Sequence, residues 1–390
     1  MKPPVMVHVA WEPRTGVWSV IKNLLRWQKI TGIAGAGIFF SSDHEYVEWL
    51  RNEIVYNQID AQVFYRQDYK LSRLVELFDG TLSDELLKIR ELHQEDSLYL
   101  LFHDAHFSSV FFPLNKKIEA TTIATFHGCP NGLLLHHPVK QRLHHWLGRR
   151  LVKYVDGIVS VNNFSIPLIC DKLFLDTDAM HTVYNGVPAQ NQTQIMSKML
   201  SKSTFAVGFI GGLDDNKQWS IAVEAVRKAY TSNDSIRLVI AGVGPERAKL
   251  EQWVACNPTF TTYLGEVRSA ADTVIPNLDL LILTSKNEGM PMVILEAIAC
   301  GIPVVATRVG GIPEIIKDSE NGYLVDSKTD SDLIASKIIS IANSPELYEQ
   351  LKKNALETFN SSFSIEICGK SYLKLFRKLE SKKRRKDAVL

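Results

Sequence analysis

Cysteine is scarce in this sequence, and no two cysteines lie close together. The 390 residues include five, at Cys129, Cys170, Cys256, Cys300 and Cys368, and none forms a CxxC pair. An odd number of widely spaced cysteines argues against a disulfide framework and against a zinc site. The cysteine pattern therefore predicts a protein of a reducing compartment.

Long apolar runs and a strong charge of one sign are also absent. No run approaches the roughly 18–20 apolar residues that span a bilayer, and the first residues, MKPPVMVHVAW, read as a short buried strand rather than a signal peptide. The formal net charge of +1 argues against a general nucleic-acid or polyanion binder. These absences predict a cytoplasmic protein, at most peripheral on the inner face of the cytoplasmic membrane.

Short apolar strands alternate with amphipathic helices along most of the chain, which predicts an α/β protein with parallel, doubly wound sheets. The polar stretch Ala189–Ser203 reads as a linker. We therefore expect one Rossmann-like domain over 1–188, a second over 204–363, and a helix with a basic tail over 364–390 that returns toward the first domain. The predicted strands are Val5–Ala10, Gly35–Phe40, Gln62–Tyr65, Leu98–Phe102, Thr122–Phe126, Gly157–Val161, Thr182–Tyr184, Phe205–Ile210, Arg237–Ala241, Thr261–Leu264, Leu278–Thr284, Pro303–Ala306 and Gly322–Val325.

The most informative stretch is 285–314, SKNEGMPMVILEAIACGIPVVATRVGGIPE. Glu288 lies in a Gly/Pro loop after an apolar strand, and Glu296 lies in the helix expected to start near Pro291. Eight residues separate them, close to two helical turns, so we expect both carboxylates to face the mouth above the strand. Such mouths bind phosphorylated ligands in α/β proteins, and carboxylates there suit sugar and ribose hydroxyls.

A glycine-rich loop opens the second domain. Gly211 and Gly212 follow a strand, and Lys217 stands at the start of the next helix. Glycines, a helix N-terminus and a lysine together indicate a diphosphate cradle. In the first domain, Gly16 occupies a similar strand-to-helix position, and His127-Gly128 follows a strand.

With these motifs in this order, the chain resembles the retaining GT-B glycosyltransferases of family 4, also called group 1. The resemblance covers almost the whole chain and is strongest from Thr204 to Asp326. Its markers are the Glu288–Glu296 stretch, Gly211 with Lys217, Gly242-Val-Gly244-Pro245, Leu264-Gly265-Glu266-Val267, His127-Gly128 and Asn185-Gly186-Val187. It implies two Rossmann-like domains facing a central cleft.

The resemblance also implies a role for each matching residue. Lys217 would neutralise the diphosphate of a nucleotide-sugar donor, and Glu296 would hold the ribose. Glu288 would hold the donor sugar, and His127 would lie beside that sugar from the first domain; these two are the catalytic candidates. The remaining donor-binding candidates are Gly16, Gly211, Gly212, Val267 at the nucleobase, and the loop Gly289, Met290, Pro291 and Met292. A nucleoside diphosphate can leave without a metal when a lysine, amides and a helix dipole stabilise its charge. No metal and no further cofactor are expected.

One position departs from the family pattern. Family members carry a Gly-Arg pair where this chain has Gly211-Gly212, so one charge-assisted contact to the diphosphate, worth about 1.5–3 kcal/mol, is missing. Arg14 and Arg308 are candidates to replace it. A second group, His103, Asp104 and His106, has the residue types of a metal site but is better explained as hydrogen-bonded loop residues near the acceptor side.

The segment 136–153, HHPVKQRLHHWLGRRLVK, is strongly basic and contains a tryptophan. Either it is an amphipathic helix that contacts an anionic membrane, or it is a domain helix with a solvated basic face. The C-terminal run KKRRK reads as a solvated tail.

Together these features predict transfer of a sugar from a nucleotide sugar, with UDP the favoured nucleotide, to a bacterial surface glycan. The acceptors considered are a lipid-linked exopolysaccharide, O-antigen and lipopolysaccharide core. One alternative is a soluble enzyme that glycosylates a small molecule, and another is a silent glycosyltransferase-like subunit, which the Gly212 departure motivates.

Overall fold

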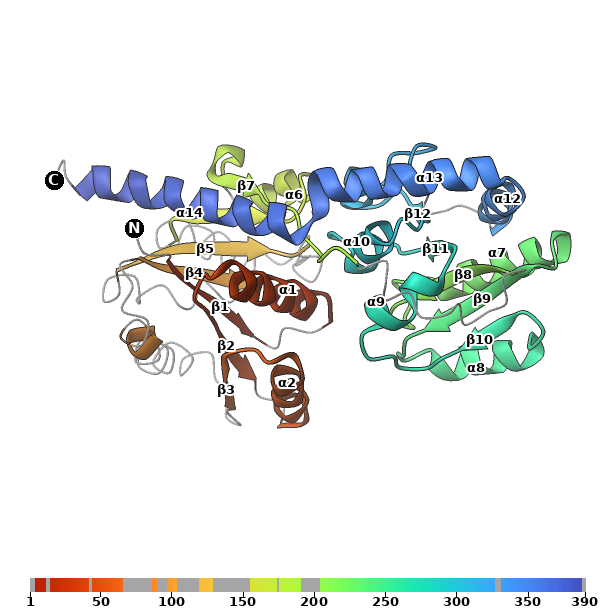
Figure 1. Cartoon of the computed structure of the whole chain (residues 1–390), viewed down its shortest axis with the longest axis horizontal. Coiled ribbons are helices and arrows are strands. Elements are labelled where there is room, and N and C mark those ends of the chain that lie inside the picture. The colour runs from red at the N-terminus through yellow and green to blue at the C-terminus, as the bar shows by residue number, and fades with distance from the viewer. Residues whose placement is uncertain are drawn as a thin grey trace. The chain divides into compact units, whose positions relative to one another are not determined.

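The protein consists of two compact units (Figure 1). The structure is a computed structural model that describes residues 4–11, 15–41, 44–65, 86–89, 91, 97–103, 119–128, 155–173, 175–190, 204–326 and 331–387. Unit 1 comprises Met1–Gly186 together with Ile365–Leu390, and unit 2 comprises Val187–Ser364. The last helix thus belongs to the unit that contains the N-terminus.

The described residues of unit 1 form a seven-stranded parallel sheet in the order β3-β2-β1-β4-β5-β6-β7. Helices α1 and α2 follow β1 and β2, as expected for parallel strands joined by crossovers. The strands are β1 (Val5–Trp11), β2 (Gly35–Ser41), β3 (Ala61–Tyr65), β4 (Leu98–His103), β5 (Ala120–Phe126), β6 (Gly157–Ser160) and β7 (Met180–Thr182), and the helices are α1 (Thr15–Thr31), α2 (His44–Asn57), α6 (Ser165–Leu173), the short 3-10 helix η3 (Thr177–Ala179) and α14 (Ile365–Asp387).

The central strands of unit 1 have one apolar and one partly polar face. Val5, Val7 and Val9 pack with Leu98 and Leu100 in one buried cluster. Side chains alternate along a strand, so His8 and Ala10 point to the opposite face. Ala10 packs there with residues of α1, and α1 also contacts α14. This second face therefore lies under helices from both ends of the chain.

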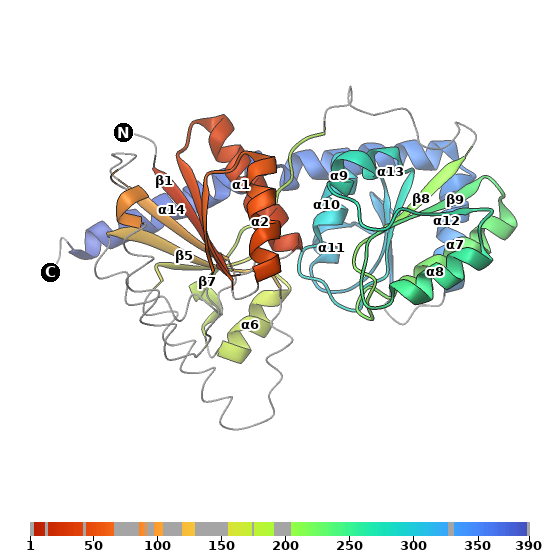
Figure 2. The same ribbon diagram turned by 90° about the horizontal axis from the view of Figure 1, so that it is seen from below.

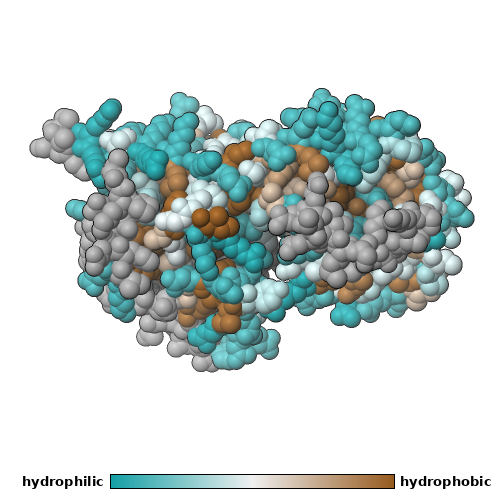
Figure 3. Space-filling model, in the orientation of Figure 1, coloured by the Kyte–Doolittle hydropathy of each residue, from teal (hydrophilic) through white to brown (hydrophobic). Residues whose placement is uncertain are grey.

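Helix α14 is held on the sheet by buried side chains and by one carboxylate. The Phe376 ring stacks on Tyr99 with centroids 4.5 Å apart. Glu380 accepts hydrogen bonds from Ser97 Oγ at 2.8 Å and from Tyr99 Oη at 3.1 Å. Lys374, on the opposite side of the helix, is exposed, and the surface along this edge of the molecule is hydrophilic (Figure 3). The amphipathic period of this segment thus places its apolar stripe against β4 and β5.

The described residues of unit 2 form a six-stranded parallel sheet in the order β10-β9-β8-β11-β12-β13. Its strands are β8 (Phe205–Ile210), β9 (Ile236–Ala241), β10 (Thr261–Tyr263), β11 (Leu280–Leu283), β12 (Val304–Thr307) and β13 (Gly322–Val325). Its helices are α7 (Trp219–Ser232), α8 (Arg247–Cys256), α9 (Ala270–Thr273), η5 (Ile275–Asn277), α10 (Met292–Ala299), α11 (Ile312–Ile315), α12 (Ser331–Ala342), α13 (Pro345–Thr358) and the π-helical η6 (Phe359–Phe363). Figure 2 shows these helices around the sheet.

A large apolar cluster joins one face of the unit 2 sheet to helices such as α7 and α12. Alternating strand residues such as Val207, Phe209 and Ile282 pack against Val226 of α7 and Ile338 of α12. On β8, Gly208 faces the other way, where an added Cβ would stand 2.2 Å from Leu278 Cδ1. This packing fixes the strands, and hence the loops at their carboxyl ends.

The predicted α/β architecture with parallel sheets is confirmed, and each predicted strand overlaps an observed one. The largest error concerns β7, predicted at Thr182–Tyr184 but observed at Met180–Thr182, where it pairs with β6. The first unit ends at Gly186 instead of residue 188. Val187 belongs to unit 2 because its N–H donates to Phe363 O at 3.1 Å and it bridges to Ser364.

Two expectations concern membranes. Among the described residues, no helix is long and apolar enough to cross a bilayer. The basic segment 136–153, the proposed membrane contact, lies outside the described residues. Three other residues named above, Arg14, Asp104 and His106, and most of the predicted linker also lie outside them.

Candidate functional site

The predicted donor-binding residues of unit 2 lie in loops at the carboxyl ends of neighbouring parallel strands. Gly211, Gly212 and Lys217 follow β8, and Glu288 follows β11. Because β8 and β11 pair directly, their loops emerge side by side at one edge of the sheet. The two most distinctive sequence motifs are therefore brought together by strand order, although 71 residues separate Lys217 from Glu288.

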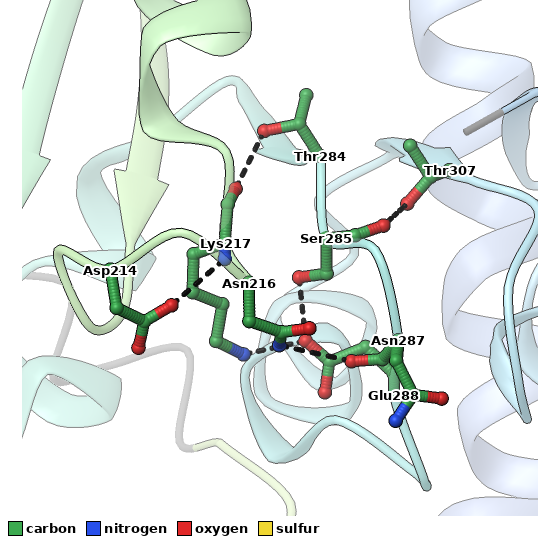
Figure 4. A network of polar contacts seen from close by, with 8 residues as sticks. All are labelled: Asp214, Asn216, Lys217, Thr284, Ser285, Asn287, Glu288 and Thr307. Atoms are coloured by element: carbon green, nitrogen blue, oxygen red, sulfur yellow. Dashed lines mark hydrogen bonds and ion pairs between the residues drawn. The ribbon is translucent and has the colours of Figure 1, made fainter. Parts of the chain in front are cut away.

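Lys217 and Glu288 form the central contact of this edge (Figure 4). Lys217 Nζ donates to Glu288 Oε1 at 2.5 Å, and Ser285 Oγ donates to the same oxygen at 2.6 Å. The Lys217 and Glu288 side chains keep only 21% and 11% of their accessible surface. A charge-assisted hydrogen bond in such a half-buried place holds both charged groups in defined positions.

Buried hydroxyl groups fix the backbone beneath this pair. Thr284 Oγ1 donates to the carbonyl oxygens of Lys217 and Gln218, at 3.0 Å each. Thr307 Oγ1, at the end of β12, donates to Ser285 O at 2.6 Å. Three strand ends are thereby tied together, which limits movement of the loop that carries Glu288.

Gly310 is the point where the backbone after β12 approaches Glu288. Its φ is +52°, and an added Cβ would stand 1.7 Å from Glu288 O. The N–H of the next residue, Gly311, donates to Gly289 O at 3.0 Å. Only glycine can hold this conformation and this approach without displacing the Glu288 loop.

Replacing Gly310 with alanine is therefore expected to move Glu288 as well as to strain the backbone. The left-handed conformation alone costs an alanine about 1–2 kcal/mol. Gly32→Ala is a matched control, because Gly32 has φ +72° but nothing within 4 Å of an added Cβ. Calorimetric titration with nucleotide sugars should show weaker binding for Gly310→Ala and unchanged binding for Gly32→Ala. Equal affinities in the two variants would contradict the positioning role of Gly310.

The glycine loop after β8 packs against the loop after β9. An added Cβ at Gly242 would stand 1.9 Å from Gly211 O, so the two loops touch through their backbones. Asp214 Oδ1 accepts the Lys217 N–H at 2.9 Å and fixes the turn before α7. Gly212 occupies the position at which the family pattern has arginine. A Cβ added at Gly212 would lie 3.0 Å from Asp214 Oδ2, so the Asp214 carboxylate is next to this position. Arg308, one candidate replacement, pairs with Asp318 at 3.1 Å.

The structure confirms the expected position of Glu288 in a loop and of Glu296 in the helix that follows. Helix α10 begins at Met292, so Glu296 is in the helix and Glu288 is in the loop before it. Helical periodicity applies only within one helix, so the eight-residue spacing does not set their relative direction. Glu296 is half-buried, and its charge contributes to raising the pKa of Cys300, one turn later, to about 12, where burial is the larger cause.

The other candidate residues of unit 2 lie at the start of α10 and in the loop after β10. Met290, Pro291 and Met292 are buried at the start of α10, and Gly289 accepts the Gly311 N–H. Val267 lies half-buried in the loop between β10 and α9.

The remaining candidates belong to unit 1. Gly16 is exposed in the first turn of α1, and His127 follows the end of β5. His127 Nε2 lies 2.9 Å from His103 Nδ1. Within the part of the chain that the structure describes, no group of three or more side chains could hold a metal ion.

Sequence reasoning missed the residues that position this site. Ser285, Thr307 and Asp214 make short hydrogen bonds to the predicted residues or to their loops. A usable signal existed for two of them, because Ser285 comes just after an apolar strand and Thr307 ends one, whereas Asp214 lies in the loop after β8. In unit 1, His8 and Gln28 were also missed, and their contacts are described below.

Comparison with known proteins places this site in a family. Residues 191–358 match the family model for glycosyl transferases group 1. N-acetyl-alpha-D-glucosaminyl L-malate synthase of Bacillus anthracis is 26% identical over 74% of this chain and 76% of its own length. A protein of the cps region of Klebsiella pneumoniae, described as uncharacterised, is 23% identical over 95% of this chain and 99% of its own.

Solved structures share the fold at low sequence identity. HepE of Anabaena in complex with UDP has a TM-score of 0.75 at 16% identity, covering 97% of this chain and 100% of that one. Sucrose-phosphate synthase of Thermosynechococcus elongatus has a TM-score of 0.72 at 16% identity, with 97% and 100% coverage. The predicted GT-B fold is thereby confirmed. Residues 191–358, almost all of unit 2, therefore form a domain of the glycosyl transferases group 1 family, within a chain that has the GT-B fold.

Proposed function

We propose that this enzyme transfers a sugar from a UDP-sugar to a surface-glycan acceptor, with retention of anomeric configuration and without a metal. The acceptor class is a lipid-linked exopolysaccharide, an O-antigen or a lipopolysaccharide core. The observation that carries the proposal is the Lys217–Glu288 pair at the carboxyl ends of β8 and β11. Peripheral contact of residues 136–153 with an anionic membrane remains part of this proposal.

The chemistry follows from the charges at this pair. Departure of a nucleoside diphosphate develops negative charge on its phosphate oxygens, and a fixed cation stabilises that charge without a metal. Lys217 supplies the cation, and its present partner Glu288 would turn to the sugar hydroxyls when the diphosphate takes its place. Glu296 would hold the ribose, and Val267 would contact the nucleobase. His127 and Gly16 of unit 1 are proposed to contact the substrate.

The names of similar proteins support the donor and acceptor classes. HepE was crystallised with UDP and with UDP-glucose, and the Klebsiella relative is encoded in a cps region. A soluble small-molecule acceptor is the second candidate. The Bacillus anthracis relative is named N-acetyl-alpha-D-glucosaminyl L-malate synthase, and one structural neighbour is named sucrose-phosphate synthase.

Incubation with radiolabelled nucleotide sugars tests the donor, the metal and the stereochemistry together. We expect slow hydrolysis or transfer of a UDP-sugar, retained in EDTA, with a product of the same anomeric configuration by NMR. Glu288→Ala should abolish turnover, whereas Glu320→Ala, at an exposed carboxylate, should leave it unchanged. Loss of activity in EDTA, an inverted product or full activity of Glu288→Ala would each contradict the proposal. Adding malate-like small acceptors or lipid-linked glycans then separates the two acceptor classes.

A further inference from the structure

A chain of four polar side chains, three of them buried, crosses the core of unit 1. Gln28 Nε2, on α1, lies 2.8 Å from His8 Nε2. His8 Nδ1 lies 2.9 Å from His103 Nε2, and His103 Nδ1 lies 2.9 Å from His127 Nε2. Gln28, His8 and His103 are almost fully buried. The chain therefore begins under helix α1 and ends at His127, beyond the carboxyl end of β5.

The register of the sheet produces this chain. On the paired strands β1 and β4, His8 is opposite Leu101, so His103 lies two residues further along. His103 in turn is opposite Thr125 of β5, and His127 lies two residues beyond Thr125. Steps of two residues keep all three rings on one face of the sheet and move them toward its carboxyl edge. Adjacent rings are near-parallel, with interplanar angles of 19° and 18°.

The three rings are neutral at physiological pH. Burial lowers the pKa of His8 to about 3 and the pKa of His127 to about 4. Burial and its two histidine neighbours lower the pKa of His103 well below its usual value. A neutral imidazole has one N–H and one acceptor nitrogen, so each ring can donate once and accept once. The tautomer of one ring therefore dictates the tautomer of the next.

Gln28 sets the direction of the chain. Its Nε2 faces His8, and its Oε1 is so close to Gly35 that an added Cβ there would stand 1.9 Å away. An amide oxygen tolerates Cα hydrogens at this position, whereas an NH₂ group would repel them. The amide thus donates to His8 Nε2, so His8 donates from Nδ1. His103 likewise accepts at Nε2 and donates from Nδ1 to His127 Nε2. His127 Nε2 is then an acceptor, so its ring hydrogen is on Nδ1.

We propose that Gln28, His8 and His103 are positioning residues that hold His127 in the Nδ1–H tautomer, so that His127 offers a hydrogen-bond donor, not a base, to an oxygen of a bound substrate. His127 Nδ1 is buried and has no hydrogen-bond partner among the described residues, as expected of a group that a ligand completes. This inference rests on the proposed function, which supplies the ligand. The transfer remains balanced without a base at His127. The bond from the anomeric carbon to the phosphate oxygen breaks, the acceptor oxygen bonds to that carbon, and its proton passes to the departing phosphate.

Tautomers can be read directly by NMR of the full chain labelled with ¹⁵N-histidine, at neutral pH and without substrate. Long-range ¹H–¹⁵N correlations distinguish an N–H at Nδ1 from one at Nε2, and loss of signals in His127→Gln assigns that ring. We expect a single Nδ1–H tautomer at His127. An Nε2–H tautomer, or a mixture of both, would overturn the inference.

A variant of the anchor tests the coupling. Gln28→Met cannot donate, so the Nε2–H form of His127 should appear, and kcat/KM for the donor should fall about tenfold. Asn57→Leu is the matched control, because it removes another buried amide of unit 1 that lies outside the chain. It should leave the His127 tautomer unchanged, as a loss of stability alone cannot alter it. An unchanged single tautomer in Gln28→Met would contradict the role of Gln28.

The proposed function and the positioning of His127 can be refuted independently of each other. If no nucleotide sugar is turned over, the proposed function is wrong whatever the tautomers are. If turnover depends on Lys217 and Glu288 while wild-type His127 carries Nε2–H, the function stands and the positioning chain is refuted.

Discussion

Replacing Lys217 with methionine is expected to lower kcat/KM for nucleotide-sugar turnover by about 10²–10³-fold, the usual loss when one group that stabilises developing charge is removed. Two effects act in the same direction. The diphosphate loses the cation that neutralises it as it departs. Glu288, which pairs with Lys217 Nζ at 2.5 Å, would also lose its cationic partner and face the phosphate oxygens without it.

Lys286→Met provides the control for this variant. Lys286 also pairs with a carboxylate, at 2.6 Å from Asp215, but both side chains are largely exposed. Exposed pairs contribute little to stability, so this variant should keep both its fold and its activity. In a double-mutant cycle, Glu288→Gln should lower kcat/KM less in the Lys217→Met variant than it does in the wild-type protein. Additive losses would show that the two side chains act independently and would contradict the pairing.

Ending the chain after Ser364 is expected to unfold unit 1 and to leave unit 2 folded. This truncation removes α14, which buries Tyr372, Leu375, Phe376 and Leu379. Burial of each such side chain stabilises a protein by about 1.5–3 kcal/mol, so four contribute roughly 6–12 kcal/mol. That amount is comparable to the whole stability of a typical domain, about 5–15 kcal/mol.

Hydrogen exchange read by mass spectrometry locates this loss. Peptides of β4 and β5 should exchange as in an unfolded chain, whereas those of β8 and β11 should stay protected. A chain ending after Ser381 is the control, since it keeps the four buried side chains and Glu380, the acceptor of the Ser97 and Tyr99 hydrogen bonds. If strands of unit 1 remain protected in the shorter chain, α14 is not part of that unit's core.

Much of the fold could be predicted because apolar runs and strand–helix alternation are local signals. Phe205–Ile210 and Gly322–Val325 were predicted with their observed bounds. Predictions were less accurate for element and unit boundaries that depend on contacts between residues distant in the sequence. The unit boundary depends on the bridge from Val187 to Ser364, a pairing that no local pattern encodes.

The candidate site was predictable at the level of motifs but not of contacts. The helix start expected near Pro291 is confirmed, because α10 begins at Met292, but the eight-residue spacing of Glu288 and Glu296 does not by itself set the direction of the two carboxylates. The direct bond from Lys217 to Glu288 needed the neighbouring positions of β8 and β11 in the sheet. The histidine chain needed the register of β1, β4 and β5, since the three histidines share no sequence motif.

The membership of α14 in unit 1 also orders the folding of the chain as it is synthesised. Domains generally fold as units while the ribosome releases them, the N-terminal one first. Here unit 2 is complete once Ser364 has emerged, whereas unit 1, which contains the first strand, still lacks the helix that covers β4 and β5. The domain begun first is therefore finished last. A chain cut short within α14 would therefore carry a finished unit 2 attached to a unit 1 whose strands β4 and β5 lack their covering helix, a ready substrate for chaperones and proteases.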